Sequence, residues 1–290
     1  MSLRKNLIKF LCGADLEFLC LWNGQLVGNN HEEDNHKSPW GLDGGGAMLI
    51  HEVRPAPSEQ PEEIVKNIHK IFQWKISREP SFLKYNWVAG SYVKDRCLGG
   101  HLHVGIPKTI IHPKIVAQHF DHYVGAISIL LEDIEQGKKR RNYAEGEDIN
   151  GNQGYGNATD YREQPHGAEY RTPGSFLSSP YITLGFLSLT KVVAYELINN
   201  STFGWNEYIE FDDFKYMRKD KVRNKLPQIW SDITKMHLYN QYRKSLDFLK
   251  FLVDNKCIWF PKSGLKESWG IKDLKYVHKE QDMTLQDIWN

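Results

Sequence analysis

Four short segments of the chain each place two polar side chains two residues apart, with one apolar or aromatic residue between them. The segments are GADLEFL, LIHEVRP, GGHLHVG and GAEYRTP, and their pairs are Asp15 and Glu17, Glu52 and Arg54, His101 and His103, and Glu169 and Arg171. In a β-strand successive side chains point to opposite faces, so each pair lies on one face, about 6–7 Å apart. The residue between them then faces the other side, which its apolar character predicts to be packed against a core.

The residue types distinguish these pairs from ordinary solvent-facing strands, which remain the alternative for any single pair. The eight residues are carboxylates, imidazoles and guanidiniums, without a lysine. Carboxylates with one or two imidazoles are suitable ligands for Mg²⁺ or Mn²⁺. Arginine makes bidentate contacts with phosphate or carboxylate. Together the pairs predict a metal site beside an anion site, which is what phosphoryl transfer requires.

Glycines accompany two of the pairs. Gly41 and residues 44–46 surround Asp43 just before the second pair, and residues 99–100 precede the two histidines. Such glycines permit tight turns or a close approach of backbone to ligand, and turns alone also explain them. Trp40, beside the first group, is the tryptophan expected nearest a nucleotide or substrate. The sequence contains no GKS or GKT and no GxGxxG at the start of a helix, so neither a P-loop nor a dinucleotide-binding fold is indicated.

The distribution of apolar residues predicts an α+β fold. Strands are expected within residues 6–54, 86–106 and 169–172, and helices from 61, over 113–135, after 180 and through most of the chain beyond 200. No regular strand–helix alternation is visible, which favours a mostly antiparallel sheet. We expect a catalytic domain over residues 1–200 and a mainly helical extension over 201–290. Residues 137–156, which begin with the basic run KKRR, are expected to form a mobile loop with that run in water.

Composition restricts the class of partner. The chain has 290 residues, 40% of them hydrophobic, with a net charge of +1, so neither nucleic acid nor an acidic membrane surface is expected as main partner. Four cysteines without a CxxC pair predict reduced thiols in the cytoplasm, three of them buried. No signal peptide is recognisable, and no run of about 18 apolar residues predicts a membrane span.

Four sequence blocks occur in a specific order: GADLEFL, GLDGGGAMLIHEVRP, GGHLHVGI and YGNATDYREQPHGAEYRTPGSFLSSP. Over residues 13–180 the chain thereby resembles the phage-type COOH-NH2 ligases, amidoligases of the glutamine synthetase and glutamate–cysteine ligase superfamily. The resemblance implies a curved, mostly antiparallel sheet whose concave face binds ATP with Mg²⁺ or Mn²⁺. It also implies that ATP phosphorylates a carboxylate and that an amine then displaces phosphate to form an amide. The substrates would be small molecules or peptides, and a phage-encoded enzyme would act in the host cytoplasm.

The resemblance also implies roles for individual residues. The metal ligands would be Asp15, Glu17, Glu52, His101 and Glu169, the nucleotide side would include His103, Arg171 and Asp43, and the catalytic arginines would be Arg171, Arg162 and Arg54. Arg54 has two possible roles, binding a substrate carboxylate or pairing with a neighbouring acidic residue. The chain departs from the family where Pro165, His166 and Gly167 replace a Pro-Tyr-Gly step. Residues 144–154 also look like an insertion, and both departures leave the acceptor specificity open.

Two other functions are compatible with the same residues. A kinase would share the metal site and leave a stable phosphorylated product, whereas a ligase releases phosphate only with a new amide. A metal-dependent hydrolase without a nucleotide, or a binding protein that retains the fold, is the third possibility, and an absence of stabilisation by ATP with Mg²⁺ would count against both the ligase and the kinase. The sequence does not identify the carboxylate, the amine or the general base. It also leaves open whether the helical C-terminal third shapes the acceptor pocket or forms a homo-oligomer interface.

Overall fold

Strand β1, Cys12–Trp22, is the centre of the sheet in the computed structural model, which describes residues 7–28, 38–43, 49–143, 151, 154–259 and 264–271. The other strands of this sheet are β2 Gln25–Val27, β3 Trp40–Leu42, β4 His51–Val53, β5 Asn86–Val88, β8 Gly100–Val104, β9 Tyr161–Gln164 and β10 Gly167–Tyr170. Their order is β3-β4-β1-β8-β10-β9, with β2 and β5 also paired to β1. Each of these pairings is antiparallel, as is the separate pair of β6, Tyr92–Val93, and β7, Arg96–Cys97.

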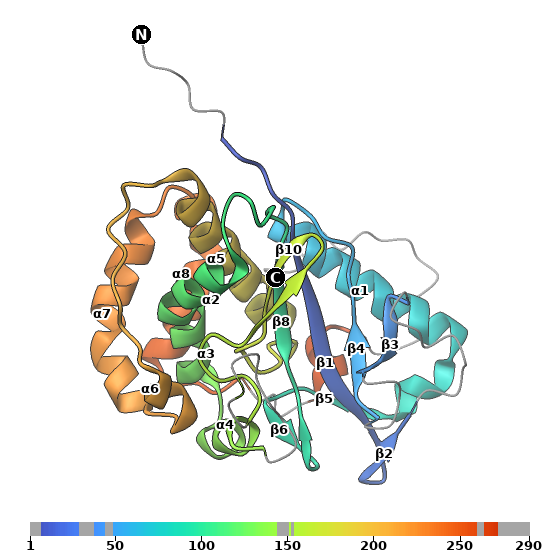
Figure 1. The fold of residues 1–290 in the computed structure, drawn as a ribbon. Helices are drawn as coiled ribbons and strands as arrows, with labels where there is room; N and C mark the ends of the chain where they lie inside the picture. The colour runs from blue at the N-terminus through green and yellow to red at the C-terminus, as the bar shows by residue number, and fades with distance from the viewer. Residues whose placement is uncertain are drawn as a thin grey trace.

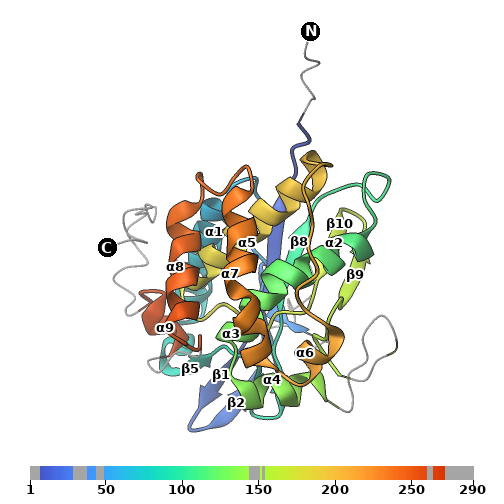
Figure 2. The same cartoon turned by 90° about the vertical axis from the view of Figure 1, so that its left-hand side faces the viewer.

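Helices cover the sheet, and the elements described after β10 are all helices. The helices are α1 Pro61–Arg78, η2 Pro80–Lys84, α2 Pro113–Phe120, the π-helix η3 Asp121–Gly125, α3 Ala126–Leu131, α4 Ile134–Arg141, α5 Pro180–Asn199, α6 Phe211–Lys215, α7 Lys219–Lys235, α8 Arg243–Asp254 and α9 Leu265–Ser268. Helix α2 packs against β9 and β10, and α5 packs against β1 and β8. In Figure 1 most helices gather at the left of the sheet, and Figure 2 shows α5, α7 and α8 from that side. The prediction of an α+β fold with a mostly antiparallel sheet is confirmed.

The long helices follow ordinary sequence rules. Helix α1 begins with Pro61, has acidic residues in its first turn and basic residues in its last turn, and buries one apolar face. Helix α5 begins after Ser179, whose hydroxyl accepts a hydrogen bond from the backbone N–H of Ile182. By length and composition α5 is the one described helix that can cross a membrane, yet 78% of that stretch is buried inside the fold. It is packed as the core helix of a globular protein is.

Two predictions about residues 113–156 are wrong. The helix expected over 113–135 ends at Leu131, because the backbone of Glu132 is extended. A new helix, α4, then begins after its N-cap residue Asp133, whose side chain accepts a hydrogen bond from the backbone N–H of Gln136. The basic run in that helix is only half exposed, since Arg140 and Arg141 are fully buried. Their guanidiniums bind a buried carboxylate and a row of backbone carbonyls, which replace water as partners. Of the loop expected over residues 137–156, residues 137–141 belong to α4, and residues 144–150 and 152–153 lie outside the described residues.

Trp40 is a core residue, so its expected place near a ligand is also wrong. Its side chain is 1% exposed and packs edge-on against Phe18, Phe82 and Trp87, while its indole N–H donates to Nδ1 of His51. These aromatic contacts account for its burial.

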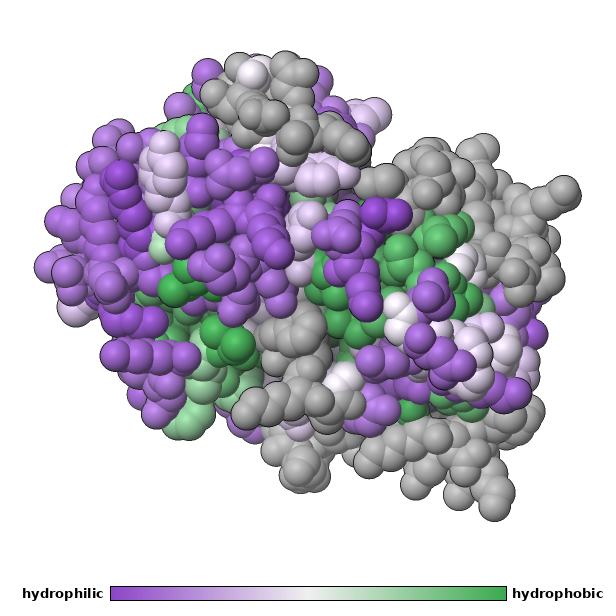
Figure 3. All heavy atoms as spheres, turned by 90° about the horizontal axis from the view of Figure 1, so that it is seen from below, coloured by the Kyte–Doolittle hydropathy of each residue, from purple (hydrophilic) through white to green (hydrophobic). Residues whose placement is uncertain are grey.

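The C-terminal helices pack directly on the rest of the chain. Helix α8 lies against α5, where the hydroxyl of Ser245 donates to that of Ser188 at 2.9 Å. The division at residue 200 remains a prediction. Cys12, Cys20 and Cys97 are free and buried, as their apolar neighbours predict. The face seen from below is mainly hydrophilic with smaller hydrophobic areas between, which is usual for a protein surface (Figure 3).

Candidate active site

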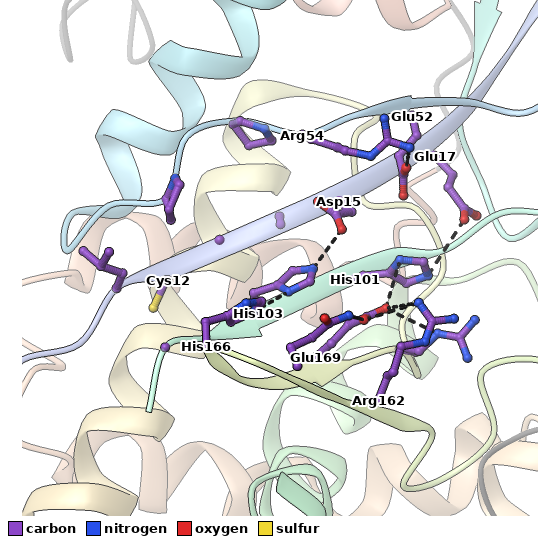
Figure 4. A pocket seen from close by; sticks show the side chains of 18 of the residues that line it. Cys12, Asp15, Glu17, Glu52, Arg54, His101, His103, Arg162, His166 and Glu169 are labelled. Atoms are coloured by element: carbon purple, nitrogen blue, oxygen red, sulfur yellow. Dashed lines mark hydrogen bonds and ion pairs between the residues drawn. The ribbon is translucent and has the colours of Figure 1, made fainter. Parts of the chain in front are cut away.

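A cavity of about 820 Å³ lies on the polar face of the sheet, over β1, β8 and β10 (Figure 4). All ten residues to which the sequence assigns a role line it: Asp15, Glu17, Asp43, Glu52, Arg54, His101, His103, Arg162, Glu169 and Arg171. The residues between the pairs, Leu16, Val53, Leu102 and Tyr170, are at most 1% exposed, on the other face. The expectation that each pair shares one face while its neighbour enters the core is therefore met.

Strand register brings the pairs together. Glu17 lies opposite Glu52, and Asp15 lies opposite His101. One strand further, His103 lies opposite Glu169. Directly opposed residues in antiparallel strands have Cβ atoms about 4.5–5.5 Å apart, so residues distant in sequence become neighbours on one surface.

Two overlapping groups of side chains are close enough to hold a cation. Ligand atoms of Asp15, Glu52 and His101 lie within 4.8 Å of one another, and so do those of Glu17, Asp43 and Glu52. Burial, together with the charges of Asp15 and Asp43, raises the pKa of Glu52 to about 7, although Arg54 opposes the shift. Burial, Asp43 and Glu52 likewise raise the pKa of Glu17. These carboxylates repel one another in a dry site, and a divalent cation would relieve that repulsion.

His101 lies between the acidic groups. Burial, followed by the charge of Arg171, lowers its pKa well below the usual value, so the ring is neutral, the form that binds metals. Its Nδ1 is 3.7 Å from Oε1 of Glu169, and its Nε2 is 3.9 Å from Oε1 of Glu17. The imidazole of His101 thus lies between the carboxylates of Glu17 and Glu169.

Glu169 contacts two arginines of the cavity, Arg162 and Arg171. It is 1% exposed, accepts hydrogen bonds from Gln164 and from Nη1 of Arg162 at 3.3 Å, and lies 3.5 Å from Nε of Arg171. Arg171 also reaches Oδ1 of Asp160 at 3.4 Å. The strand predicted over residues 169–172 includes Arg171, but β10 ends at Tyr170; the Arg171 guanidinium still enters the cavity. This side of the cavity therefore carries positive charge suited to an anion.

Arg54 pairs with Glu52, and its Nη1 donates to the carbonyl of Ser38 at 3.3 Å. Of the two roles predicted for it, the structure therefore contains the pairing. His103 has protein partners on both ring nitrogens, Asp15 on Nε2 and His166 on Nδ1, each at 3.0 Å. Its expected position on the nucleotide side remains a prediction.

Tyr155 belongs to the site and was not predicted from sequence. Its hydroxyl forms a hydrogen bond with Nε2 of His101, and its ring lies between the guanidiniums of Arg140 and Arg171, 4.5 and 4.9 Å from their central carbons. The signal was present in the sequence as glycines on both sides of the tyrosine. Gly156 has φ +75°, and a Cβ there would lie 2.0 Å from Nη1 of Arg140, so only glycine fits.

Replacing Tyr155 by phenylalanine is expected to weaken Mn²⁺ binding by about 10-fold, because the hydroxyl that orients His101 is lost while the ring between the arginines remains. Isothermal titration with Mn²⁺ measures the change. Tyr216→Phe, at an exposed position, is the matched control. Unchanged Mn²⁺ affinity in Tyr155→Phe would show that the hydroxyl does not orient a ligand.

Comparison with known proteins gives one family and one fold. The profile of the family described as "Phage phiEco32-like COOH.NH2 ligase-type 2" matches residues 12–271. A search of curated proteins finds no match. Among solved structures, the "complex between Prokaryotic Ubiquitin-like Protein Pup and its Ligase PafA" matches with a TM-score of 0.55 and 9% identity, over 91% of this chain and 67% of that chain. At this identity the match shows a shared fold.

Proposed function

The chain belongs to the phage phiEco32-like COOH.NH2 ligase-type 2 family, and we propose that it uses ATP to join a carboxylate to an amine through an acyl phosphate. The observation that supports this reaction most directly is one cavity that places two acidic ligand groups beside Arg162 and Arg171. A phosphoryl group in transfer carries charge on several oxygens, and this arrangement offers charge partners for them.

The donor set fits Mg²⁺ or Mn²⁺. Glu17, Asp43 and Glu52 would hold one ion through carboxylate oxygens, and Asp15 with His101 would share Glu52 for a second. Such an ion, when bound, neutralises charge on the nucleotide phosphates. Hard divalent cations prefer these oxygen ligands, and the single imidazole is compatible with Mn²⁺.

The arginines would act on the phosphoryl group directly. Arg171 is held by Glu169 and Asp160, so its guanidinium is positioned before any substrate arrives. Arg162 has a side chain that is 55% exposed, and its Nη1 lies 3.3 Å from Oε1 of Glu169. Glu169 contacts both guanidiniums and so orients them at the same side of the cavity.

The cavity volume falls in the range of small-molecule sites and leaves room for a second substrate beside the phosphates. In the similar solved structure, the ligase PafA is in complex with a protein, Pup. For this chain we propose a small-molecule or peptide carboxylate and a small-molecule or peptide amine.

Thermal unfolding with and without ATP and Mg²⁺ provides the first test. Millimolar Mg·ATP should raise the unfolding temperature, since a ligand that binds only the folded state stabilises it. Mass spectrometry of reactions with amino acids, polyamines and peptides should then detect an amide together with phosphate. A stable phosphorylated product without an amide would identify a kinase. If Mg·ATP does not stabilise the protein, both the ligase and the kinase function are contradicted.

Glu17→Gln and Glu52→Gln are each expected to weaken Mn²⁺ binding by about 10-fold or more, because each removes a charged ligand from the acidic groups. Titration calorimetry of the purified protein measures this without any substrate. Glu135→Gln, on the exposed face of α4, should bind Mn²⁺ as the wild type does. Equal affinities in all four proteins would remove these two carboxylates from the metal site.

A further inference from the structure

Three side chains form a hydrogen-bonded row along one edge of the cavity. Oδ2 of Asp15 is 3.0 Å from Nε2 of His103, and Nδ1 of His103 is 3.0 Å from Nε2 of His166. They come from β1, β8 and the turn between β9 and β10. We propose that His166 is the general base that accepts the proton of the amine substrate, with His103 and Asp15 as its positioning residues. This inference rests on the proposed ligase reaction.

The two hydrogen bonds leave Nδ1 as the ring nitrogen of His166 that faces no protein partner among the described residues. In the neutral form of His103, which the proposed role requires, Nε2–H donates to Asp15 and Nδ1 accepts from the Nε2–H of His166. Nδ1 of His166 then holds a lone pair. A carboxylate and an imidazole that fix the tautomer of a catalytic base are a known arrangement in proton transfer.

Three other carboxylates of the cavity already have protein partners, and Asp43 belongs to the proposed metal site. Glu17 accepts from the backbone N–H of Gly99, Glu52 pairs with Arg54, and Glu169 accepts from two side chains. Both ring nitrogens of His103 are occupied. His166 is exposed where these groups are buried, so a proton that it accepts passes readily to water.

His166 stands apart from the acidic cluster. Figure 4 places Cys12, His103 and His166 toward one end of the cavity, and Glu17 and Glu52 toward the other. Burial lowers the pKa of His166, and the charges of Asp15 and Glu169 act in the opposite direction. The net effect leaves a neutral imidazole at neutral pH, which is the form a base requires.

Each proton and electron pair of this step has a defined destination. An ammonium substrate gives one proton to Nδ1 of His166, and the resulting neutral amine attacks the carbonyl carbon of the acyl phosphate. The C–N bond forms, the bond from the acyl carbon to the phosphate oxygen breaks, and phosphate leaves with that electron pair. The second proton of the nitrogen ends on the departing phosphate, and the imidazolium releases the first to water.

Two small nucleophiles of different basicity test this role. Hydroxylamine is largely neutral at neutral pH and needs little help from a base, whereas ammonia is largely protonated. The full-length wild type and His166→Gln are assayed with ATP, Mg²⁺ and a carboxylate panel of L-glutamate, L-aspartate and short peptides. We expect His166→Gln to lower the rate of amide formation from ammonia by about 10²-fold and the rate of hydroxamate formation from hydroxylamine by much less. The loss with ammonia should shrink as the pH rises and free ammonia accumulates.

His69→Gln replaces a histidine of α1 that does not line the cavity, and it should match the wild type with both nucleophiles. Equal losses with ammonia and hydroxylamine in His166→Gln contradict the inference and leave the ligase function standing. A weaker affinity of His166→Gln for Mg·ATP, measured by thermal shift, would also contradict the inference, because it would make His166 a nucleotide contact. If the wild type uses hydroxylamine but not ammonia, it lacks a working base, and the inference about His166 is contradicted. A wild type that forms no hydroxamate from any carboxylate contradicts the proposed function itself.

Discussion

Replacing Glu169 by glutamine is expected to lower the rate of ATP-dependent amide formation by about 10²-fold or more. The substitution keeps the shape of the side chain but removes the charge that holds Arg162 and Arg171 at the cavity. The guanidiniums would then lose their fixed orientation toward the phosphoryl group. Arg171→Ala should reduce the rate by a similar factor, because it removes one of the positioned charges directly.

Phosphate release and amide formation measured together give the rate for each variant. Glu163→Gln is the matched control, since Glu163 lies on the neighbouring strand β9 and contacts Lys108 and His112 instead of cavity residues. Thermal unfolding confirms that each variant is folded. Near-normal turnover in both Glu169→Gln and Arg171→Ala would exclude this part of the cavity from phosphoryl transfer.

The largest effect on stability is expected at Glu132. Its carboxylate is fully buried and accepts from both Nη atoms of Arg141, at 2.7 and 3.0 Å, and from the hydroxyls of Ser91 and Ser128. Replacing it by glutamine leaves the Arg141 guanidinium buried without a counter-charge. The free energy of unfolding should fall by about 3–5 kcal/mol, as measured by urea denaturation.

The pH dependence of this contribution has a defined sign. Burial raises the pKa of Glu132, but the charge and hydrogen bonds of Arg141 outweigh burial and lower it to about 2. The folded-state pKa is therefore below the unfolded value of about 4.3, so the stabilisation is present above that value and is lost as pH falls toward 2. The shift corresponds to roughly 3 kcal/mol, which the wild type loses over this interval and Glu132→Gln does not.

A double variant separates the charge pair from the fold. Glu132→Gln with Arg141→Met removes the unpaired charge and should recover much of the stability lost in Glu132→Gln. Lys138→Met, on the exposed face of the same helix, should change stability little. If the single and double variants unfold at the same urea concentration, the ion pair does not determine the stability of this region.

The sequence was sufficient to predict the cavity's main residues because strand alternation is a local property. Pairs such as Asp15 and Glu17 share a face whatever strands lie beside them. The order of the four blocks then led to the family, which the profile match over residues 12–271 confirms. The roles given to individual residues stay predictions.

The basic run at residues 138–141 shows where local reasoning fails. Four consecutive cationic residues usually lie in water, and composition alone cannot predict otherwise. Arg140 is buried because its guanidinium donates to the carbonyls of Arg171, Thr172 and Pro173 at 2.9, 2.7 and 3.0 Å. That contact spans about thirty residues of sequence and supports the segment that carries Arg171.

By itself, the sequence determined which side chains share the polar face of each strand, because the period of a β-strand is two residues. Only the tertiary structure decided which pairs meet, since the register between strands depends on long-range packing. That register places Glu17 against Glu52 and His103 against Glu169. Tyr155 and His166 join the site from segments without a strand signal of their own, through contacts 54 and 63 residues away in the chain.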